Sequence, residues 1–196
     1  METQSNEKTI NISIDEKFSQ TNKNHELHFL IGEHLKFVDF GNVQKIIDPA
    51  CGGEQHIPLF LTEDKSRETQ LCKVDFMIIK DNKIKIIIEI EESDIKPTQI
   101  LGKLLTSAIA RYYIHKTTNN VNIPMADNVC FIQILDTIKL PVGSKKREQG
   151  ENIEVAINEI LPSFKANIKT YKLFYGNLSD INLNEISRFI KHKLDD

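Results

Sequence analysis

Residues 72–104 decide the fold, and they read CKVDFMIIKDNKIKIIIEIEESDIKPTQILGKL. A β-branched and aromatic run from Val74 to Lys80 meets a turn signal at Asp81-Asn82, and a nearly continuous β-branched run follows over Ile84 to Ile90. The second run is typical of a strand that is buried on both faces. Residues 97–115 begin with proline, which suits the first turn of a helix, and continue with apolar residues at helical spacing. The stretch predicts a β-hairpin followed by an amphipathic helix.

The composition of the whole chain is that of an ordinary soluble domain. Of its 196 residues, 40% are hydrophobic and 27% are charged, and the formal net charge is −3. This charge argues against a protein that coats nucleic acid indiscriminately, although a local basic patch is still compatible with it. The three cysteines are widely spaced and form no CxxC pair, so neither a disulfide framework nor a structural zinc site is indicated. No apolar run could span a bilayer and no signal peptide is evident, so we expect a cytoplasmic protein with no membrane partner.

The rest of the chain predicts further elements around the hairpin. A helix begins near Asn24, and Asn182 with Glu185 suits a capping box for a final helix. The order strand, helix, strand from the hairpin onward implies a parallel crossover. The other predicted elements are strands at residues 9–14, 43–47, 57–61, 129–135 and 171–175, a loop at residues 139–149 and a helix that begins around Ile153 and ends near Pro162.

Together these elements predict a mixed α/β fold with a central mixed β-sheet flanked by helices. We expect a single domain over residues 1–196, because a chain of this length can bury a core without disulfides. Within it, residues 24–135 form the predicted core of the domain. Residues 148–194 form a helix-strand-helix extension at its C-terminal end.

Acidic residues lie where the apolar strands leave the core. Glu89 and Glu91 point to one face of the second hairpin strand, and the carbonyl of Ile90 lies between them. Asp75 joins them in only one hairpin register. A two-residue turn at Asp81-Asn82 would set Asp75 opposite an isoleucine, whereas a loop one residue longer would set it opposite Glu89, which is the register we predict. Such oxygen ligands suit a hard divalent cation such as Mg²⁺.

An aspartate before a hairpin, an E-x-E triplet at its end and a following amphipathic helix resemble the PD-(D/E)xK nuclease superfamily, which has the restriction-endonuclease-like fold. The resemblance covers residues 24–135, where a helix, three strands, a helix and a strand follow in the family's order. It implies that Asp75 is the family's metal-binding aspartate and that Glu89 is its second acidic ligand. The sequence departs from the pattern at Val74, where the family has proline, and at Glu91, where it usually has lysine.

Other members of the family suggest which residues would replace that lysine. Some resemble this chain in using glutamate there, and others receive a lysine or glutamine from the next helix. Lys103 and Gln99 are the candidates here, one turn apart on the polar face of the predicted helix, and Lys96 is a poorer choice. Some members also place an acidic ligand on the first helix. The resemblance assigns that role to Glu33, with Glu26 as its competitor.

The resemblance implies Mg²⁺-dependent hydrolysis of phosphodiester bonds, with Mn²⁺ able to substitute. Mg²⁺ held by Asp75, Glu89 and the carbonyl of Ile90 would polarise the scissile phosphate and activate a water molecule. Glu91 would position or deprotonate that water, and Lys103 would stabilise developing charge. We therefore expect a Type II restriction endonuclease that cuts double-stranded DNA. A homodimer would present one centre to each strand of a palindromic site.

Polar and basic loop residues are the candidate DNA contacts. Two of them, Gln55 and His56, follow the distinctive loop Gly52-Gly53-Glu54. Three more form the basic run at residues 145–147, which could contact the phosphate backbone. Each group has an equally plain interpretation as a solvated loop. The candidates are Gln55, His56, Ser66, Arg67, Lys145, Lys146 and Arg147.

Two alternatives stay open. A Holliday-junction or repair nuclease would use the same fold and the same residues. A degenerate nuclease fold would bind nucleic acid or a protein without cleaving, and the missing lysine motivates that interpretation. An E-x-E triplet alone is more often a solvated strand end than a catalytic group. The position of Asp75 relative to Glu89 is therefore the decisive geometric question.

Overall fold

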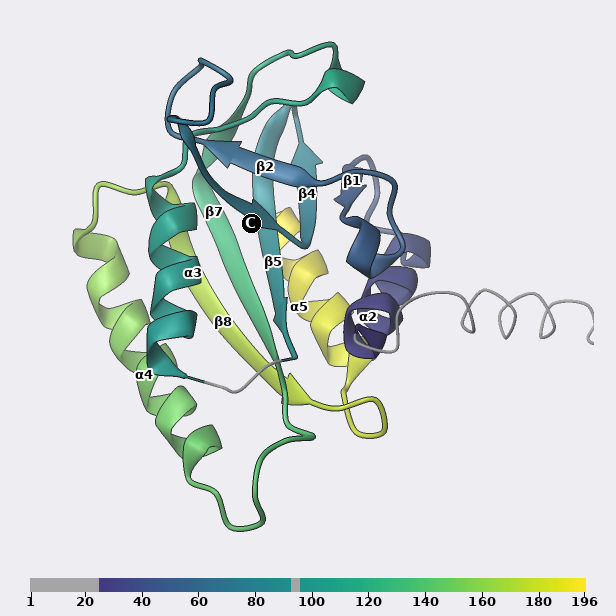
Figure 1. Cartoon of the computed structure of the whole chain (residues 1–196), viewed down its shortest axis with the longest axis vertical. Helices are drawn as coiled ribbons and strands as arrows, with labels where there is room; N and C mark the ends of the chain where they lie inside the picture. The colour runs from purple at the N-terminus through teal and green to yellow at the C-terminus, as the bar shows by residue number, and fades with distance from the viewer. Residues whose placement is uncertain (1–24, 93–95) are drawn as a thin grey trace, which may run out of the picture.

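The computed structural model describes residues 25–92 and 96–196. It has the predicted mixed α/β fold, in which an eight-stranded mixed sheet is flanked by helices (Figure 1). The helices are α2 (Glu26–Phe37), α3 (Pro97–Ile109), α4 (Lys146–Ile160) and α5 (Leu183–Asp195), with short 3-10 helices η1 (Pro49–Cys51), η2 (Lys116–Thr118) and η3 (Leu161–Ser163). The strands are β1 (Gln44–Ile47), β2 (Ile57–Phe60), β3 (Gln70–Val74), β4 (Phe76–Lys80), β5 (Lys83–Glu91), β6 (Tyr112–Tyr113), β7 (Ile123–Asp136) and β8 (Ile168–Gly176).

Strand β7 joins two parts of the sheet. Its first residues pair antiparallel with β6, which leads on to β2 and β3. The rest of β7 pairs in parallel with β5 on one side and β8 on the other. The strand order is β1-β4-β5-β7-β6-β2-β3, with β8 beside β7. The chain passes from β5 to β7 through α3, which is the predicted connection between parallel strands.

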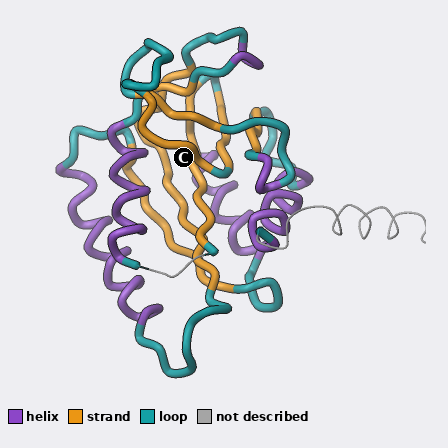
Figure 2. The backbone as a smooth tube through the Cα atoms, viewed as in Figure 1, coloured by secondary structure: helices purple, strands orange, loops and turns teal. Residues whose placement is uncertain are grey.

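Helices cover both faces of the sheet (Figures 1 and 2). Residues of α3 and α4 pack into one apolar core, and residues of α2 and α5 pack into the other. Strand β5 lies between β4 and β7, so its isoleucines are buried on both sides, as predicted: Ile87 faces the first core, and Ile86 and Ile88 face the second. Each such side chain contributes about 1.5–3 kcal/mol of stability by leaving water.

The structure corrects two predicted boundaries around the central stretch. The first hairpin strand is divided, because the chain bends at Asp75 between β3 and β4. The predicted helix over 97–115 ends at Ile109. Beyond it, the N–H of Arg111 donates to the carbonyl of Phe60 at 2.8 Å, and Tyr112–Tyr113 pair with β2 and β7 as a short strand.

The C-terminal third belongs to the same sheet and the same two cores. Strand β8 pairs with β7, and α5 packs on the face that α2 also covers. The predicted cap of the final helix is confirmed, because the side chain of Asn182 accepts the N–H of Glu185 at 3.1 Å. The predicted strand at residues 9–14 lies outside the described residues.

Candidate active site

The candidate site lies where the chain passes from β3 to β4. The backbone carbonyl of Asp75 accepts the N–H of Asp48 at 3.0 Å, and one carboxylate oxygen of Asp75 accepts the N–H of Ile90 at 2.7 Å. Strand β3 pairs with β2, whereas β4 pairs with β1 and β5. Asp75 is therefore fixed at the boundary between the two parts of the sheet, with its side chain against the end of β5.

The turn of the β4–β5 hairpin is shorter than we predict from the sequence. Lys80 pairs with Lys83, so the turn contains only Asp81 and Asn82. Both have positive φ, 52° and 56°, as the two central residues of a type I′ turn require. The prediction of a longer loop is wrong.

A β-bulge nevertheless restores the predicted register at the site. Ile79 pairs with Ile84, but Ile78 pairs with Ile86, so Lys85 is an extra residue in β5. Beyond the bulge every pairing is shifted by one residue. As a result, Phe76 pairs with Ile88, and Asp75, the residue before Phe76, has its carboxyl group within hydrogen-bonding reach of Glu89.

Glu89 is buried beneath α3 and forms an ion pair with Lys103 of that helix. Its side chain is 4% exposed, and its Oε2 accepts the ammonium of Lys103 at 2.9 Å. The same ammonium lies 3.6 Å from Oε2 of Glu91. The structure thus brings together Asp75, Glu89, Glu91 and Lys103. A buried ion pair of this kind is weak evidence for a stabilising role, because desolvation opposes the attraction between the charges.

Asp75 and Glu89 do not ionise independently. Burial raises the pKa of Glu89, and the negative charge of Asp75 raises it further, to about 8, although Lys103 opposes the change. Burial also acts to raise the pKa of Asp75, but His28 and the N–H of Ile90 outweigh it, and the pKa of Asp75 falls below its ordinary value. The two carboxyl groups therefore titrate as a coupled pair, in which Asp75 loses its proton at lower pH than Glu89.

Two other predicted residues lie on α3 or beside it. Gln99 is half-buried one turn before Lys103, on the same side of the helix. Lys96 is exposed at the N-cap of α3, further from that turn. Ile90 presents its side chain to the opposite core. The roles of Gln99 and of the carbonyl of Ile90 stay predictions.

The two acidic candidates on α2 contact other groups. Oε1 of Glu33 lies 3.2 Å from the ammonium of Lys36, and it approaches Gly52, where an added Cβ would stand 2.9 Å from it. Glu26 lines a cavity beside Glu92. The described contacts place neither carboxylate against Asp75, so a ligand role for Glu33 stays a prediction.

Sequence reasoning missed His28 and Glu92. Nε2 of His28 lies 3.6 Å from Oδ2 of Asp75, and its Nδ1 lies 3.2 Å from Oε2 of Glu92. Burial acts to lower the pKa of His28, but the two carboxylates outweigh it and raise the pKa to about 9. The other oxygen of Glu92 accepts the backbone N–H groups of Leu27 and His28 at the start of α2. Two features of the sequence could have pointed to them: His28 lies beside the apolar stripe of the first helix, and Glu92 directly follows the E-x-E triplet.

The candidate DNA contacts before β3 are partly engaged with other groups. Nδ1 of His56 lies 2.8 Å from Oδ2 of Asp48, and the amide of Gln55 donates to the hydroxyl of Tyr113. Ser66 bonds within its own loop, whereas Arg67 is exposed.

The basic run lies in a different setting from the one predicted. Lys145 is the N-cap of α4, and Lys146 and Arg147 occupy the first turn of that helix, so the prediction of a loop through residue 149 is wrong. The guanidinium of Arg147 lies 3.3 Å from Oε1 of Glu151. A phosphate contact by any of the seven candidates stays a prediction.

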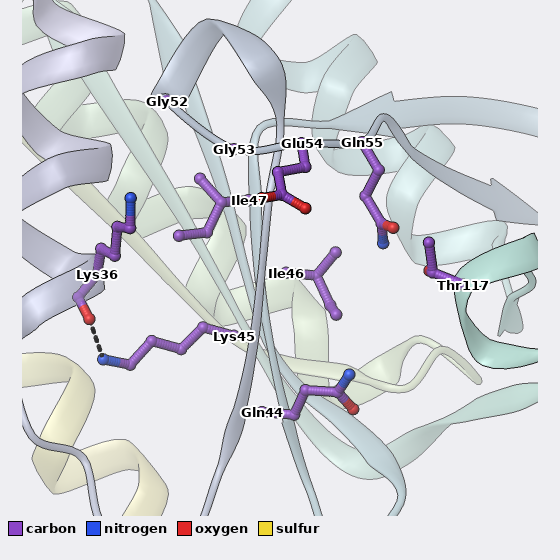
Figure 3. A pocket seen from close by; sticks show the side chains of 10 residues that line it. All are labelled: Lys36, Gln44, Lys45, Ile46, Ile47, Gly52, Gly53, Glu54, Gln55 and Thr117. Atoms are coloured by element: carbon purple, nitrogen blue, oxygen red, sulfur yellow. Dashed lines mark hydrogen bonds between the residues drawn. The ribbon is translucent and has the colours of Figure 1, made fainter.

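A separate cavity of about 360 Å³ lies beside the Gly52-Gly53-Glu54 loop. Lys36 reaches it from α2, Gln44 and Lys45 from β1, and Thr117 from η2, and the side chain of Gln55 points toward it (Figure 3). The ammonium of Lys45 donates to the carbonyl of Lys36 at 3.0 Å. None of the four residues Asp75, Glu89, Glu91 and Lys103 lines this cavity.

Comparison of the chain with protein-family models, with curated proteins and with solved structures found no match. A search of the described helices for one that is long and apolar enough to cross a membrane found none.

Proposed function

We propose that this protein is a Mg²⁺-dependent endonuclease that hydrolyses phosphodiester bonds in double-stranded DNA. The observation that supports it is the approach of two carboxylates, Asp75 and Glu89, at the end of a buried strand, with the ammonium of Lys103 2.9 Å from Glu89. Carboxylates together with one cationic side chain are the groups that phosphodiester hydrolysis requires. We further propose that α2 to β7 form a restriction-endonuclease-like core.

The donor set fits a hard divalent cation. Asp75 and Glu89 supply carboxylate oxygens, and the carbonyl of Ile90 lies between Glu89 and Glu91. Burial is the main cause of the raised pKa of Glu89, and the negative charge of Asp75 adds to it; a cation between the two carboxylates would offset that repulsion. When bound, Mg²⁺ or Mn²⁺ would polarise the scissile phosphate and lower the pKa of a bound water molecule.

The remaining side chains would act on the substrate directly. Glu91 has the more exposed carboxylate, at 15% against 4% for Glu89, so it would orient the attacking water and accept its proton. Lys103 would stabilise charge on the phosphate by turning from Glu89 toward the substrate. Gln99, one turn earlier on α3, would hold a neighbouring phosphate oxygen.

The substrate class and assembly follow from the same proposal. A Type II restriction endonuclease cuts both strands of a palindromic site, and a homodimer would supply the two centres that this needs. A Holliday-junction or repair nuclease would use the same carboxylates on another DNA structure. Product pattern separates these classes, because only a restriction enzyme yields discrete fragments from linear DNA.

A specific observation favours a second candidate, a nuclease-like module that binds without cleaving. Lys103 is already paired with Glu89 at 2.9 Å and lies 3.6 Å from Glu91, so a cationic side chain of the protein itself stands beside the carboxylates. Such a module would bind DNA or a protein with the same affinity in EDTA as in Mg²⁺.

Plasmid cleavage with Mg²⁺ and with EDTA tests the proposal. Wild-type protein should cut only with the metal, and Glu89→Gln should lower the rate by about 100-fold or more because it removes a ligand charge. Glu154→Gln is the matched control, since Glu154 also pairs with a lysine at 2.9 Å, Lys172, but on α4 and β8. That variant should cut like the wild type.

Discrete fragments would support the restriction enzyme, and cleavage confined to branched DNA would support a resolvase. Intact DNA under all metals and substrates, with DNA binding that Glu89→Gln does not alter, would reject the nuclease in favour of the binding module.

A further inference from the structure

The end of β5 and the start of α2 form a second cluster, made of His25, His28 and Glu92. Nδ1 of His25 lies 3.4 Å from Oε2 of Glu92, and Nδ1 of His28 lies 3.2 Å from the same oxygen. One ligand atom from each residue can be chosen so that all three lie within 4.8 Å of one another. The cluster therefore gathers two imidazoles and one carboxylate around one point.

Two of these atoms are buried and lack a well-aligned hydrogen bond. Nδ1 of His28 and Oε2 of Glu92 lie 3.2 Å apart as an ion pair, yet neither makes a hydrogen bond of good geometry to a residue that the structure describes, and the His28 side chain is only 9% exposed. A buried polar atom without such a bond is unfavourable. Because both atoms face the same point, one group bound there would satisfy them together.

Two of the three separations between donor atoms match a small tetrahedral ion. At metal–ligand bonds of about 2.05 Å, a tetrahedral site has ligand atoms about 3.3 Å apart. The two contacts to Oε2 of Glu92, 3.2 Å and 3.4 Å, lie on either side of that value, and the whole set lies within 4.8 Å. Imidazole nitrogens with a carboxylate suit Zn²⁺ and similar transition metals better than Mg²⁺, which prefers oxygen ligands.

We propose that His25, His28 and Glu92 bind a transition-metal ion of the Zn²⁺ class, in a site separate from the Asp75–Glu89 pair. The ion joins the N-terminus of α2 to the end of β5. The ion binds one ring nitrogen of each histidine and one carboxylate oxygen of Glu92. Three protein ligands leave at least one coordination position open to exchangeable ligands.

The surrounding contacts hold the three ligands in orientation. Oε1 of Glu92 accepts the N–H groups of Leu27 and His28, which leaves Oε2 for the ion. On its other side, Nε2 of His28 faces Oδ2 of Asp75 at 3.6 Å. A carboxylate behind a metal-bound histidine is the usual arrangement that orients the ring and increases its basicity.

The site is open to solvent on one side. The His25 side chain is 47% exposed, and a cavity of about 380 Å³ lined by Glu26, Glu92 and Lys139 reaches the cluster. The ammonium of Lys139 donates to the backbone carbonyl of Glu92 at 2.8 Å, away from the carboxylate. A metal ion can therefore enter without unfolding of the helix.

Co²⁺ is the probe, because tetrahedral or five-coordinate Co²⁺ absorbs visible light far more strongly than octahedral Co²⁺. Titration of the full-length wild-type protein should give an intense visible band that saturates at one ion per chain, and added Zn²⁺ should abolish it. Glu92→Gln and His25→Gln should each weaken Co²⁺ binding by more than about tenfold, so that the band is lost at the Co²⁺ concentration that just saturates the wild type. In Glu92→Gln the amide oxygen can still accept the two N–H groups of α2, so circular dichroism should show an unchanged fold.

His192→Gln is the matched control, since His192 also faces a carboxylate, that of Asp196, at 3.9 Å on an exposed helix end. It should bind Co²⁺ like the wild type. A band that survives in both Glu92→Gln and His25→Gln, or that disappears in His192→Gln, would overturn the proposal.

The nuclease proposal is tested independently by the same variants. Glu89→Gln should lose cleavage and keep the Co²⁺ band, whereas His25→Gln should lose the band and keep Mg²⁺-dependent cleavage. Loss of the band in Glu89→Gln would mean that the ion binds the Asp75–Glu89 pair, and the second site would be rejected.

Discussion

At the scale of single residues, the chemistry of the site depends on how deeply Glu89 is buried. Glu89 is 3% exposed, less than any other carboxyl group that the structure describes. Burial and the charge of Asp75 favour the neutral form of Glu89 and raise its pKa, whereas Lys103 favours the charged form and lowers the pKa. A small change in either set of contacts would therefore change the protonation state of Glu89 at neutral pH.

This balance predicts that ionisation of Glu89 opposes folding in the metal-free protein. The pKa of Glu89 is about 8 in the folded state against 4.5 for an ordinary glutamate, so the folded state loses relative stability as the pH rises from about 4.5 to about 8. The stability of Glu89→Gln, which cannot ionise, should therefore rise relative to that of the wild type across this range, by on the order of 4 kcal/mol between pH 4.5 and pH 8.

Urea unfolding in EDTA at pH 5 and pH 8 measures this difference. Glu154→Gln serves again as the control and should show no such gain with pH. A wild-type protein whose stability relative to Glu89→Gln does not fall between the two pH values would contradict the prediction.

The sequence predicted the types and positions of the acidic residues, but not their environment. Asp75, Glu89 and Glu91 are recognisable because they stand at the ends of apolar strands. The burial of Glu89 and the contact with Lys103 depend on where α3 packs, which no local pattern reports. His28 was missed for the same reason, because a histidine on an apolar helix face has meaning only once Asp75 and Glu92 are known to lie beside it.

At the scale of elements, capping decides where α5 begins. The side chain of Asn182 accepts the N–H of Glu185 at 3.1 Å, and replacing such a cap by alanine costs about 1 kcal/mol. Asn182→Ala should lower the free energy of unfolding by about that amount in urea titrations. Asn184→Ala, an exposed position two residues further inside the helix, should be neutral or slightly stabilising, since alanine is the better helix former. Equal losses in both variants would argue against the cap.

The hairpin shows where prediction of elements fails. The strands and the turn at Asp81-Asn82 were predictable from local residue preferences, but the bulge at Lys85 was not, because pairing with β4 on one side and β7 on the other creates it. Tyr112 and Tyr113 fit a helical pattern as well as a strand, and their pairing with β2 and β7 decides the outcome. Contacts between segments distant in sequence thus override the local pattern in both cases.

At the scale of the whole molecule, one close approach fixes α2 to the loop that precedes β2. A Cβ on Gly32 would stand 2.0 Å from the carbonyl oxygen of Cys51, a distance that no side chain adjustment can relieve. Gly32→Ala should therefore cost about 2 kcal/mol or more, because α2 must move away from η1, which contains Cys51.

Gly102→Ala is the matched helical substitution, because nothing lies within 4 Å of its added Cβ. It should stabilise the protein by up to about 1 kcal/mol through the lower entropy of the unfolded chain. Thermal unfolding of the two variants should move in opposite directions from the wild type, and a destabilised Gly102→Ala or a neutral Gly32→Ala would contradict the packing described.

The C-terminal third should be indispensable to folding. A chain that ends at residue 145 would lose β8 from the edge of β7 and α5 from the face that α2 covers, exposing Ile132, Ile134 and other buried side chains. We expect such a truncated chain to lack a cooperative thermal transition in calorimetry. A sharp transition with native-like enthalpy per residue would show that residues 1–145 fold without the C-terminal third.

The bulge at Lys85 has an evolutionary consequence. Loss of one codon there would leave Asp75, Glu89, Glu91 and Lys103 all present in the gene, yet it would move Asp75 out of register with Glu89. Lineages of this protein could therefore lose or regain the paired carboxylates through a single insertion or deletion. Two orthologues that differ by one gap in this hairpin would look nearly identical in an alignment and still differ in whether they can hold a cation.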